Sequence, residues 1–316
     1  VVSREGAFLV NNLLFVLFTF TVLVGTLFPI IAEAVRGVKV SVGEPFFNRM
    51  AVPLCFAILA LLAIGPALPW GRADRRSLLR ALVWPLPAAL VGLLNTALFG
   101  AREPYVLFSG ALAGYAIWVT FDQALRPAAA RARKGEPLPK ALAVSARRGD
   151  RRLGGYLVHL GVIVTFAAIA ISSTYQSGQE ANLAPGQSMH PEDYQLTFLQ
   201  AEQEKRPHLT AEKAVVEVNR NGDRVAVLEP SLNFYPFRTD PIGTPAVRST
   251  LGHDLYLTLQ SVDRNGRAGI RVITTPAVAW GWIGVVVMVA GMGICLLPAR
   301  QRQPAVVRGA VEETGS

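Results

Sequence analysis

One titratable side chain stands inside an apolar stretch that is long enough to cross a bilayer. The stretch GGYLVHLGVIVTFAAIAISS, residues 154–173, carries His159 five residues after its start. A transmembrane helix needs about 20 apolar residues, and ionisable residues within such helices usually serve a function. A neutral imidazole can bind a metal or haem iron, or take part in proton transfer. We therefore expect the chemistry of this chain to centre on His159.

Three alternatives for His159 follow from its place in the sequence. The imidazole can simply donate a hydrogen bond to a backbone carbonyl of a neighbouring helix. A proton relay would need a second ionisable group at similar depth, and Asp122, near the end of another apolar block, is the one candidate. A haem or metal site needs a single imidazole from this stretch and a second ligand from elsewhere. The residues alone leave these alternatives open.

The other polar residues near the membrane have structural explanations. Asn11 and Asn12 lie inside the first apolar block, where amides hydrogen-bond across helices. Arg4 and Glu5 precede them at the interface, where they can pair. The aromatic loop VSVGEPFFN, residues 40–48, is either an interfacial anchor or a docking lip on the outer face.

The remaining histidines lie in a long polar segment between the last two apolar blocks. His190 and His208 are in loop-like sequence and are expected to be solvated surface residues. His253 precedes Asp254 and a strand-like run, so we expect it at a strand edge with a local hydrogen bond. The sequence contains no phosphate-binding glycine loop, no nucleophile elbow and no HExxH motif. The sequence therefore identifies no catalytic residue, and the catalytic residues are unknown.

Long apolar blocks predict the fold class, a polytopic α-helical membrane protein. Half of the 316 residues are hydrophobic, and the apolar residues are gathered in blocks rather than alternating with polar ones. Pro85 and Pro87 lie near the start of the third block, where they should loosen the first turn without ending the helix. Cys55 and Cys295 both lie inside apolar blocks, so neither a disulfide framework nor a metal site is expected from them. The six predicted transmembrane blocks are residues 7–34, 51–70, 81–100, 106–125, 154–173 and 277–297.

The net charge of +9 is explained by membrane orientation rather than by a nucleic-acid partner. Residues 126–152 contain nine Lys or Arg and two acidic residues, and residues 71–80 and the tail 298–316 are also basic. Six crossings place these three segments on one side, which the positive-inside rule identifies as cytoplasmic. We expect both termini and the basic loop 126–152 to be cytoplasmic. The chain lacks an initiator Met, so we expect it to be part of a longer protein or a split polypeptide.

A β-rich domain is predicted on the opposite, outer side, over residues 175–276. The segment has ten Lys or Arg against twelve Asp or Glu, and its apolar and polar residues alternate as in half-buried strands. Asn221-Gly222 and Asn265-Gly266 are suited to tight turns between strands. We expect five or six strands. The chain is thus predicted to have four parts. They are a membrane domain with the first five transmembrane helices (1–174), the β-rich domain (175–276), the last transmembrane helix (277–297) and the tail (298–316).

Several stretches together resemble the C-terminal half of the CcmF family, the large membrane subunit of the bacterial cytochrome c maturation machinery. The resemblance runs nearly the whole chain, and the outer segment matches more loosely through FYPFR and DLYLTL. The stretches that carry it, in order, are SREGAFLVNNLL, TVLVGTLFPI, VSVGEPFFNRM, AIGPALPWGR, GGYLVHLGV and AIAISSTYQ.

The resemblance implies a cytochrome c haem lyase of the bacterial inner membrane, with residues 175–276 in the periplasm. Members of the family receive haem from a covalent haem chaperone on the outer face and join its vinyl groups to the thiols of a CxxCH motif in apocytochrome c. They also hold a haem b in the membrane, which keeps the substrate haem reduced, with quinol as the electron donor expected from the family. One axial ligand of that haem lies in the pattern HLG, which falls on His159 here. Haem b is therefore the implied cofactor, and His159 the implied ligand of its iron.

The chain lacks several features of the family. The tryptophan-rich WWD segment that handles the substrate haem, its two flanking outer-face histidines and the second membrane ligand of haem b are absent. The implied partners are therefore a chain or segment that carries the WWD motif, the haem chaperone, apocytochrome c, thiol-handling accessory subunits and membrane lipid, with no nucleic acid. Two rival functions remain. A transporter subunit would show internal repeats and broken helices around a midplane site, and a scaffold subunit presenting residues 175–276 would tolerate replacement of His159.

Overall fold

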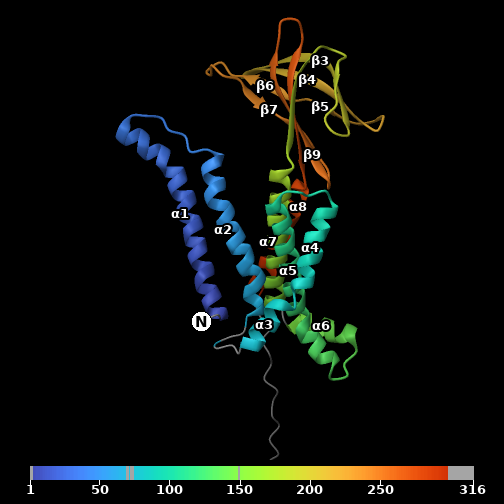
Figure 1. Ribbon diagram of the computed structural model, residues 1–316. Helices are drawn as coiled ribbons and strands as arrows, with labels where there is room; N and C mark the ends of the chain where they lie inside the picture. Colours follow the sequence, from blue (N-terminus) through green and yellow to red (C-terminus); the bar gives the residue numbers. More distant parts are fainter. Residues whose placement is uncertain (1–2, 69–70, 72–74, 149, 298–316) are drawn as a thin grey trace, which may run out of the picture.

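A helical membrane region carries a β-rich domain at one end (Figure 1). The computed structural model describes residues 3–68, 71, 75–148 and 150–297. Six helical segments in these residues are long and apolar enough to cross a membrane. The predicted fold class, a polytopic α-helical membrane protein with one β-rich domain, is confirmed. The tail 298–316 lies outside the described residues.

The helices follow the apolar blocks, although most of them extend into the flanking polar residues. Helix α1, for example, begins after an N-cap hydrogen bond from the Gly6 amide to the Ser3 hydroxyl, and it ends at Gly37 with φ +66°. The described helices are α1 (Arg4–Arg36), α2 (Glu44–Ile64) with the 3-10 turn η1 (Gly65–Ala67), α3 (Arg75–Val83), α4 (Leu86–Leu98), α5 (Pro104–Ala132), α6 (Leu138–Arg148), α7 (Asp150–Thr174) and α8 (Val278–Leu296).

The third apolar block is two helices, and the prediction of one uninterrupted helix was wrong. Helix α3 ends at Val83 and α4 begins at Leu86, with a turn between them. Pro85 and Pro87 lack the amide hydrogens that would continue the backbone ladder, and their rings clash with the preceding turn. Two prolines at this spacing therefore break the helix, although the two pieces together still form one candidate span, Arg75–Leu98.

The basic segment 126–152 is mostly helical rather than a loop. Helix α5 continues to Ala132, α6 occupies Leu138–Arg148, and α7 begins at Asp150. Arg131 forms an ion pair with Glu136 at 2.8 Å across the turn that joins α5 to α6. The sequence prediction missed these helices because it treated basic charge as a sign of loop structure. Charged and alanine-rich segments form helices readily when they lie in water.

Helices α7 and α8 are in close contact because glycines face each other across their antiparallel interface. A Cβ on Gly161 would lie 2.5 Å from the Gly284 carbonyl oxygen, and a Cβ on Gly154 would lie 2.6 Å from the Gly291 carbonyl oxygen. Side chains at these positions would force the helices apart. Small residues at helix interfaces allow such close backbone approach in membranes, where dispersion and polar contacts drive helix association.

Helices α2, α5 and α7 share the buried core of the membrane region. Leu59 of α2, Ala116 of α5 and Ile163 of α7 are buried together. Helix α1 lies outside this core, and its one buried described residue is Gly25. Figure 1 shows α1 and α2 side by side, with their upper ends leaning away from the other helices. The core and the glycine contacts therefore fix α7 from two sides.

The β-rich domain is a sandwich of two antiparallel sheets with ten described strands, so the prediction of five or six was too low. The first sheet has the order β1-β10-β9-β8, and the second has the order β2-β3-β4-β6-β7 with β5 also paired to β4. Four strands of two to seven residues, β1, β2, β7 and β8, show little alternation in the sequence and were missed. The strands are β1 (Ser177–Leu183), β2 (Ser188–Met189), β3 (Tyr194–Arg206), β4 (Leu209–Arg220), β5 (Asp223–Leu228), β6 (Ser231–Phe234), β7 (Ile242–Thr244), β8 (Ala246–Ser249), β9 (His253–Val262) and β10 (Ala268–Pro276).

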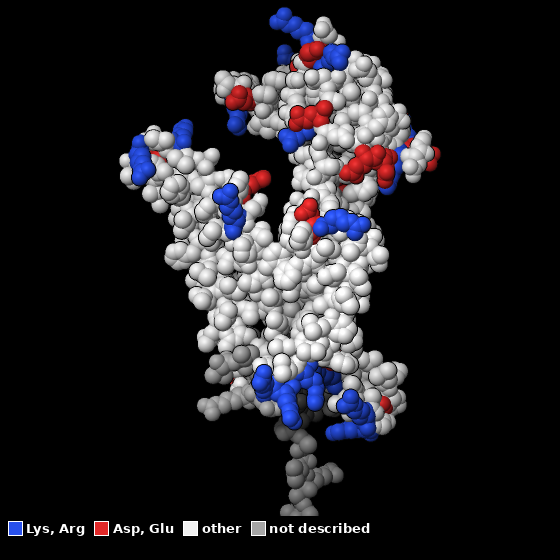
Figure 2. Space-filling view, viewed as in Figure 1, with Lys and Arg blue, Asp and Glu red and all other residues white. Residues whose placement is uncertain are grey.

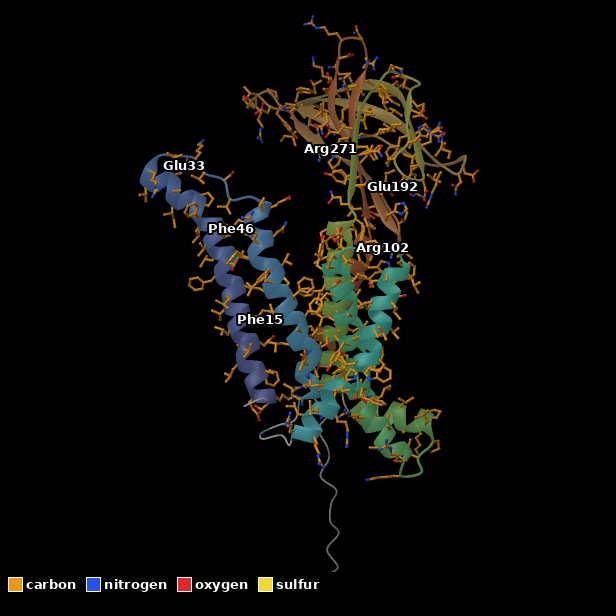
Figure 3. The ribbon with its side chains drawn as sticks, viewed as in Figure 1. Phe15, Glu33, Phe46, Arg102, Glu192 and Arg271 are labelled. Atoms are coloured by element: carbon orange, nitrogen blue, oxygen red, sulfur yellow. The ribbon has the colours of Figure 1, made fainter. Side chains whose placement is uncertain are left out.

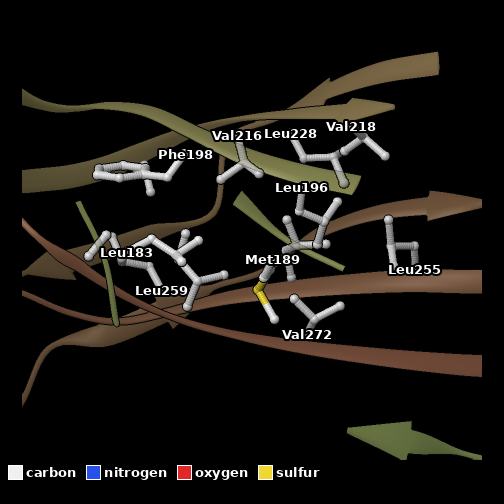
Figure 4. Packing of buried hydrophobic residues seen from close by; sticks show 14 of the residues in the cluster. Leu183, Met189, Leu196, Phe198, Val216, Val218, Leu228, Leu255, Leu259 and Val272 are labelled. Atoms are coloured by element: carbon white, nitrogen blue, oxygen red, sulfur yellow. The ribbon is translucent and has the colours of Figure 1, made fainter. Parts of the chain in front are cut away.

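The two sheets enclose one apolar core, which forms from the inward side of each alternating strand (Figure 4). Phe198, Val216 and Leu257 are fully buried in it. Both predicted Asn-Gly turns are present: Asn221-Gly222 joins β4 to β5 with both φ angles positive, and Gly266, at φ +73°, lies between β9 and β10. The alternation of apolar residues therefore predicted the long strands and their hairpins correctly.

The sandwich is joined to the membrane region by two short connections. Helix α7 ends at Thr174 and β1 begins at Ser177, while β10 ends at Pro276 and α8 begins at Val278. The strands β1 and β10 pair with each other from the Ser177–Thr274 position onward. The paired helices α7 and α8 therefore continue into paired strands, and we call this unit the stem.

Candidate functional site

The structure places His159 within α7, nine residues after its start at Asp150. Residues four apart lie on the same face of a helix, so His159 shares its face with Ile163. Ile163 is buried against α2 and α5. Gly154 and Gly161 instead face α8. The imidazole is therefore on the side of α7 that is turned away from the α7–α8 contact.

The imidazole of His159 has no hydrogen-bond partner among the described residues. Its Nδ1 atom is buried and unpaired. A buried polar atom without a partner costs about 1–3 kcal/mol, so native structures rarely leave one unpaired unless another group binds there. The alternative of a histidine satisfied by a neighbouring carbonyl is thus not what the structure shows. The ring is available to a ligand that this chain does not itself supply.

Gly155 leaves space beside His159. It lies one turn before the histidine on the same face of α7, and a Cβ built there would meet no atom within 4 Å. The three glycines near His159 are therefore of two kinds: α8 packs against Gly154 and Gly161, whereas Gly155 faces open space. The buried, unpaired Nδ1 atom of His159 therefore belongs to a residue one turn away from a glycine that faces open space.

The described part of the chain offers no set of ligands that could hold a bare metal ion. No three His, Cys, Asp or Glu side chains come together there. Haem has a smaller requirement, because the porphyrin supplies four nitrogen ligands and the protein supplies one or two axial ones. The donor set at His159 thus fits a haem iron better than a free ion.

Asp122, the candidate for a proton relay, is engaged elsewhere. Its carboxylate accepts from Arg126, one turn along the same helix, at 2.7 Å. The structure gives no hydrogen bond between Asp122 and His159, so the two predicted residues are not brought together as a relay.

The polar residues of α1 act locally. The Arg4 guanidinium donates to the Pro66 carbonyl oxygen at 2.7 Å, and the Gly71 amide donates to the Glu5 carboxylate at 3.1 Å. These bonds attach the start of α1 to the connection after α2. Asn11 and Asn12 form no hydrogen bond across helices within the described residues, so the expected interhelical bond is not seen.

The aromatic segment 40–48 joins α1 to α2. Helix α2 already begins at Glu44, and Phe46 lies near its start (Figure 3). The rings of Phe46 and Phe47 are close to Gly25 of α1. A Cβ on Gly25 would lie 2.7 Å from Phe47, so only glycine allows this contact. These aromatic residues therefore pack α2 against α1.

His253 is the one sandwich histidine with a specific contact. Its Nε2 lies 2.7 Å from the Tyr194 hydroxyl, which also accepts from Arg248 at 3.1 Å. Tyr194 is buried at the membrane-proximal end of β3. A local hydrogen bond was expected for the His253 side chain, but its ring is bonded instead to Tyr194, which lies 59 residues away in the sequence and was not predicted. His190 and His208 lie in loop and turn residues, as expected.

These features define a class: a membrane protein with six candidate spans among its described residues, a β-sandwich inserted before the last one, and a histidine with a buried, unpaired Nδ1 atom in the span before the sandwich. Residues 174–276 match the family described as CcmF C-terminal beta-sandwich. The predicted resemblance to the C-terminal half of CcmF is confirmed, and the chain is similar to that half over nearly its full length.

Relatives of known name support this assignment. The chain is 30% identical over 302 residues to the cytochrome c-type biogenesis protein CcmF of Pseudomonas aeruginosa, which covers 95% of this chain and 45% of that protein. It is 29% identical to the CcmF protein of Escherichia coli K12, with the same coverage. A solved structure named cytochrome c heme lyase CcmF superposes with a TM-score of 0.75 at 28% identity, over 94% of this chain and 46% of that one. The chain spans about half the length of the curated relatives that it matches.

Proposed function

We propose that this chain forms one half of a cytochrome c haem lyase and that His159 is an axial ligand of a haem b within the membrane. The observation that carries the proposal is the buried, unpaired Nδ1 atom of His159, with open space beside Gly155 one turn away. The relatives named as cytochrome c biogenesis proteins and as a haem lyase give the same class of cofactor.

The residues of α7 would hold the haem in three ways. His159 would bind the iron as a neutral imidazole, the form that carries a free lone pair. Gly155 would let the macrocycle approach the helix backbone. The aliphatic residues around them would exclude water. Bound haem b would supply a redox centre that keeps the substrate haem in the ferrous form needed for thioether formation, with quinol as the proposed electron source.

The second ligand and the catalytic segment would come from a partner. No second described histidine lies in a membrane helix of this chain. The partner would carry the WWD segment, either as a separate polypeptide or as the other half of a longer protein. Haem b would then lie between the two halves and stabilise their association by mass action.

The charge distribution supports a proposed orientation in the bacterial inner membrane. Lysines and arginines gather at the end of the helical region opposite the sandwich (Figure 2). The positive-inside rule makes this end cytoplasmic. The sandwich would then be periplasmic, where it would form a docking surface for apocytochrome c, the haem chaperone or a thiol-handling subunit.

An optical spectrum of the chain purified with its partner half tests the proposal. The wild type should show a low-spin b-type spectrum, and His159→Gly should lose it together with most cytochrome c assembly. Added imidazole should restore part of the spectrum to His159→Gly, because a free ligand can occupy the space left by the side chain. The matched control His208→Gly removes an exposed sandwich histidine and should keep the spectrum.

Two outcomes would contradict the proposal. A normal b-type spectrum in His159→Gly would return His159 to the status of a buried structural residue. A wild-type complex without haem would favour the scaffold function over the lyase.

A further inference from the structure

An apolar groove runs along the outside of α4 and α5. Its volume is about 610 Å³, and Gly92 of α4 and Gly114 of α5 lie at its floor, where the two helices are in close contact. Trp84 and Trp118 line one end, with ring centroids 6.3 Å apart. Val91 is 65% exposed on the side of the groove, so no described part of the chain covers this surface.

The groove continues into a second hollow with charged residues. Trp118 and Phe121 line both, and the second, of about 450 Å³, follows one face of α5 as far as Arg133. Arg126 lies in this hollow, paired with Asp122 at 2.7 Å. Arg133 forms no ion pair with any described residue. The two arginines and one aspartate give the hollow a net charge of about +1.

The depth of these residues matches one leaflet of a bilayer. Helix α5 begins at Pro104, and a helix rises about 1.5 Å per residue. Gly114 is therefore roughly 15 Å along the helix, near the centre of a hydrocarbon layer about 30 Å thick. Arg126 is roughly 33 Å along it, at the opposite edge. The apolar part of the groove thus spans about half a bilayer, and the basic part begins where lipid headgroups lie.

We propose that this groove is a binding site for one anionic phospholipid of the leaflet at the basic end of the helices. An acyl chain would lie between α4 and α5 against Gly92, Gly114 and the two tryptophans. The phosphate would accept hydrogen bonds from Arg133 and from the guanidinium nitrogens that Arg126 does not use for Asp122. Basic pockets beside membrane helices bind anionic headgroups in this way. The site is separate from His159 and does not depend on the proposed haem.

Native mass spectrometry of the full chain tests the site. The purified protein is mixed with phosphatidylglycerol and phosphatidylcholine that carry the same acyl chains. The wild type should retain phosphatidylglycerol preferentially, and Arg126→Gln/Arg133→Gln should lower that preference about tenfold or more. The matched control Lys134→Gln/Lys140→Gln removes the same charge from the same side but outside the groove, and it should keep the preference.

Two further variants separate the headgroup contact from the acyl groove. Asp122→Asn removes the one acidic residue in the hollow and should strengthen phosphatidylglycerol binding. This variant still tests the headgroup contact if the double variant fails to fold. Val91→Trp fills the apolar groove and should reduce retention of both lipids. The proposal is wrong if the arginine double variant behaves like its lysine control, or if Asp122→Asn and Val91→Trp leave lipid retention unchanged. Cross-linking of Val91→Cys to another protein chain in the membrane would show that a helix, and not a lipid, covers the groove.

Discussion

Two glycines on α7 should respond in opposite ways to the same substitution, Gly→Ala. At Gly161 the added Cβ would lie 2.5 Å from the Gly284 carbonyl oxygen and 2.6 Å from Met288 Cγ. Ordinary contact begins at 3.4 Å, so α7 and α8 would have to separate by about 0.9 Å. At Gly155 the same methyl group meets nothing within 4 Å. The two variants therefore add the same methyl group to a glycine, once in a close-packed helix contact and once in open space.

The expected cost at Gly161 follows from overpacking. Extra methyl groups in a close-packed contact cost about 1–3 kcal/mol. Alanine in place of glycine in a helix returns about 1 kcal/mol. Gly161→Ala should therefore lower the free energy of unfolding by up to about 2 kcal/mol, whereas Gly155→Ala should leave it unchanged or raise it slightly. The free energies of both variants are measured by reversible unfolding in mixed detergent micelles.

The haem content of the same variants provides the second measurement. Gly155→Ala should lower haem retention in the complex with the partner half, because its methyl group occupies the space beside His159. Gly161→Ala should keep its haem in proportion to the folded fraction. The reasoning fails if Gly155→Ala is the less stable variant, or if it binds haem as the wild type does while Gly161→Ala does not.

Two further measurements test the orientation and the electrostatics of the sandwich. In a chain whose native cysteines are replaced by serine, cysteines introduced at Arg133 and Asp223 should be labelled from opposite sides of the membrane, and labelling from one side would refute the positive-inside argument. Hydrogen bonds from Arg206 and Lys213 lower the pKa of Glu204 to about 2 from 4.5. A lowered pKa in the folded state stabilises the β3–β4 hairpin above about pH 4.5, and this contribution is lost as the pH falls towards 2. The protection factors of the hairpin amides, which are exchange rates corrected for their intrinsic pH dependence, should fall over this range in the wild type but not in Glu204→Gln; the same fall in both would show that Glu204 is not the cause.

The sequence predicts those features that local patterns control. Runs of about 20 apolar residues gave the six spans, and alternation with Asn-Gly turns gave the long strands, because both signals lie within one element. The helix break at Pro85 could have been predicted from the sequence. Two prolines within three residues remove two backbone N–H donors, which is more than one helical turn tolerates. The short strands β2 and β7 are stabilised by their neighbours in the sheet, and no local pattern marks them.

The candidate site shows the same division. His159 was identifiable because an imidazole is exceptional among apolar residues. The lack of a hydrogen-bond partner for His159 could not be predicted, because it depends on every helix that packs around the imidazole. Likewise, the separate roles of Gly154 and Gly155 depend on where α8 lies. The contact between Tyr194 and His253 depends on the arrangement of the two sheets, which bring together residues 59 positions apart.

The stem gives the sandwich a mechanical connection to the membrane helices. A domain attached through one flexible connection could rotate freely. Here the α7–β1 and β10–α8 connections lie side by side, and β1 and β10 pair as soon as the helices end. Two parallel attachments resist twisting and tilting in a way that one flexible tether does not. A protein that pulls or turns the sandwich would therefore exert torque on α7 and α8 as a pair. Because His159 lies 15 residues before the end of α7, roughly 22 Å along the helix, that torque would reach the imidazole through a continuous rod of hydrogen-bonded backbone.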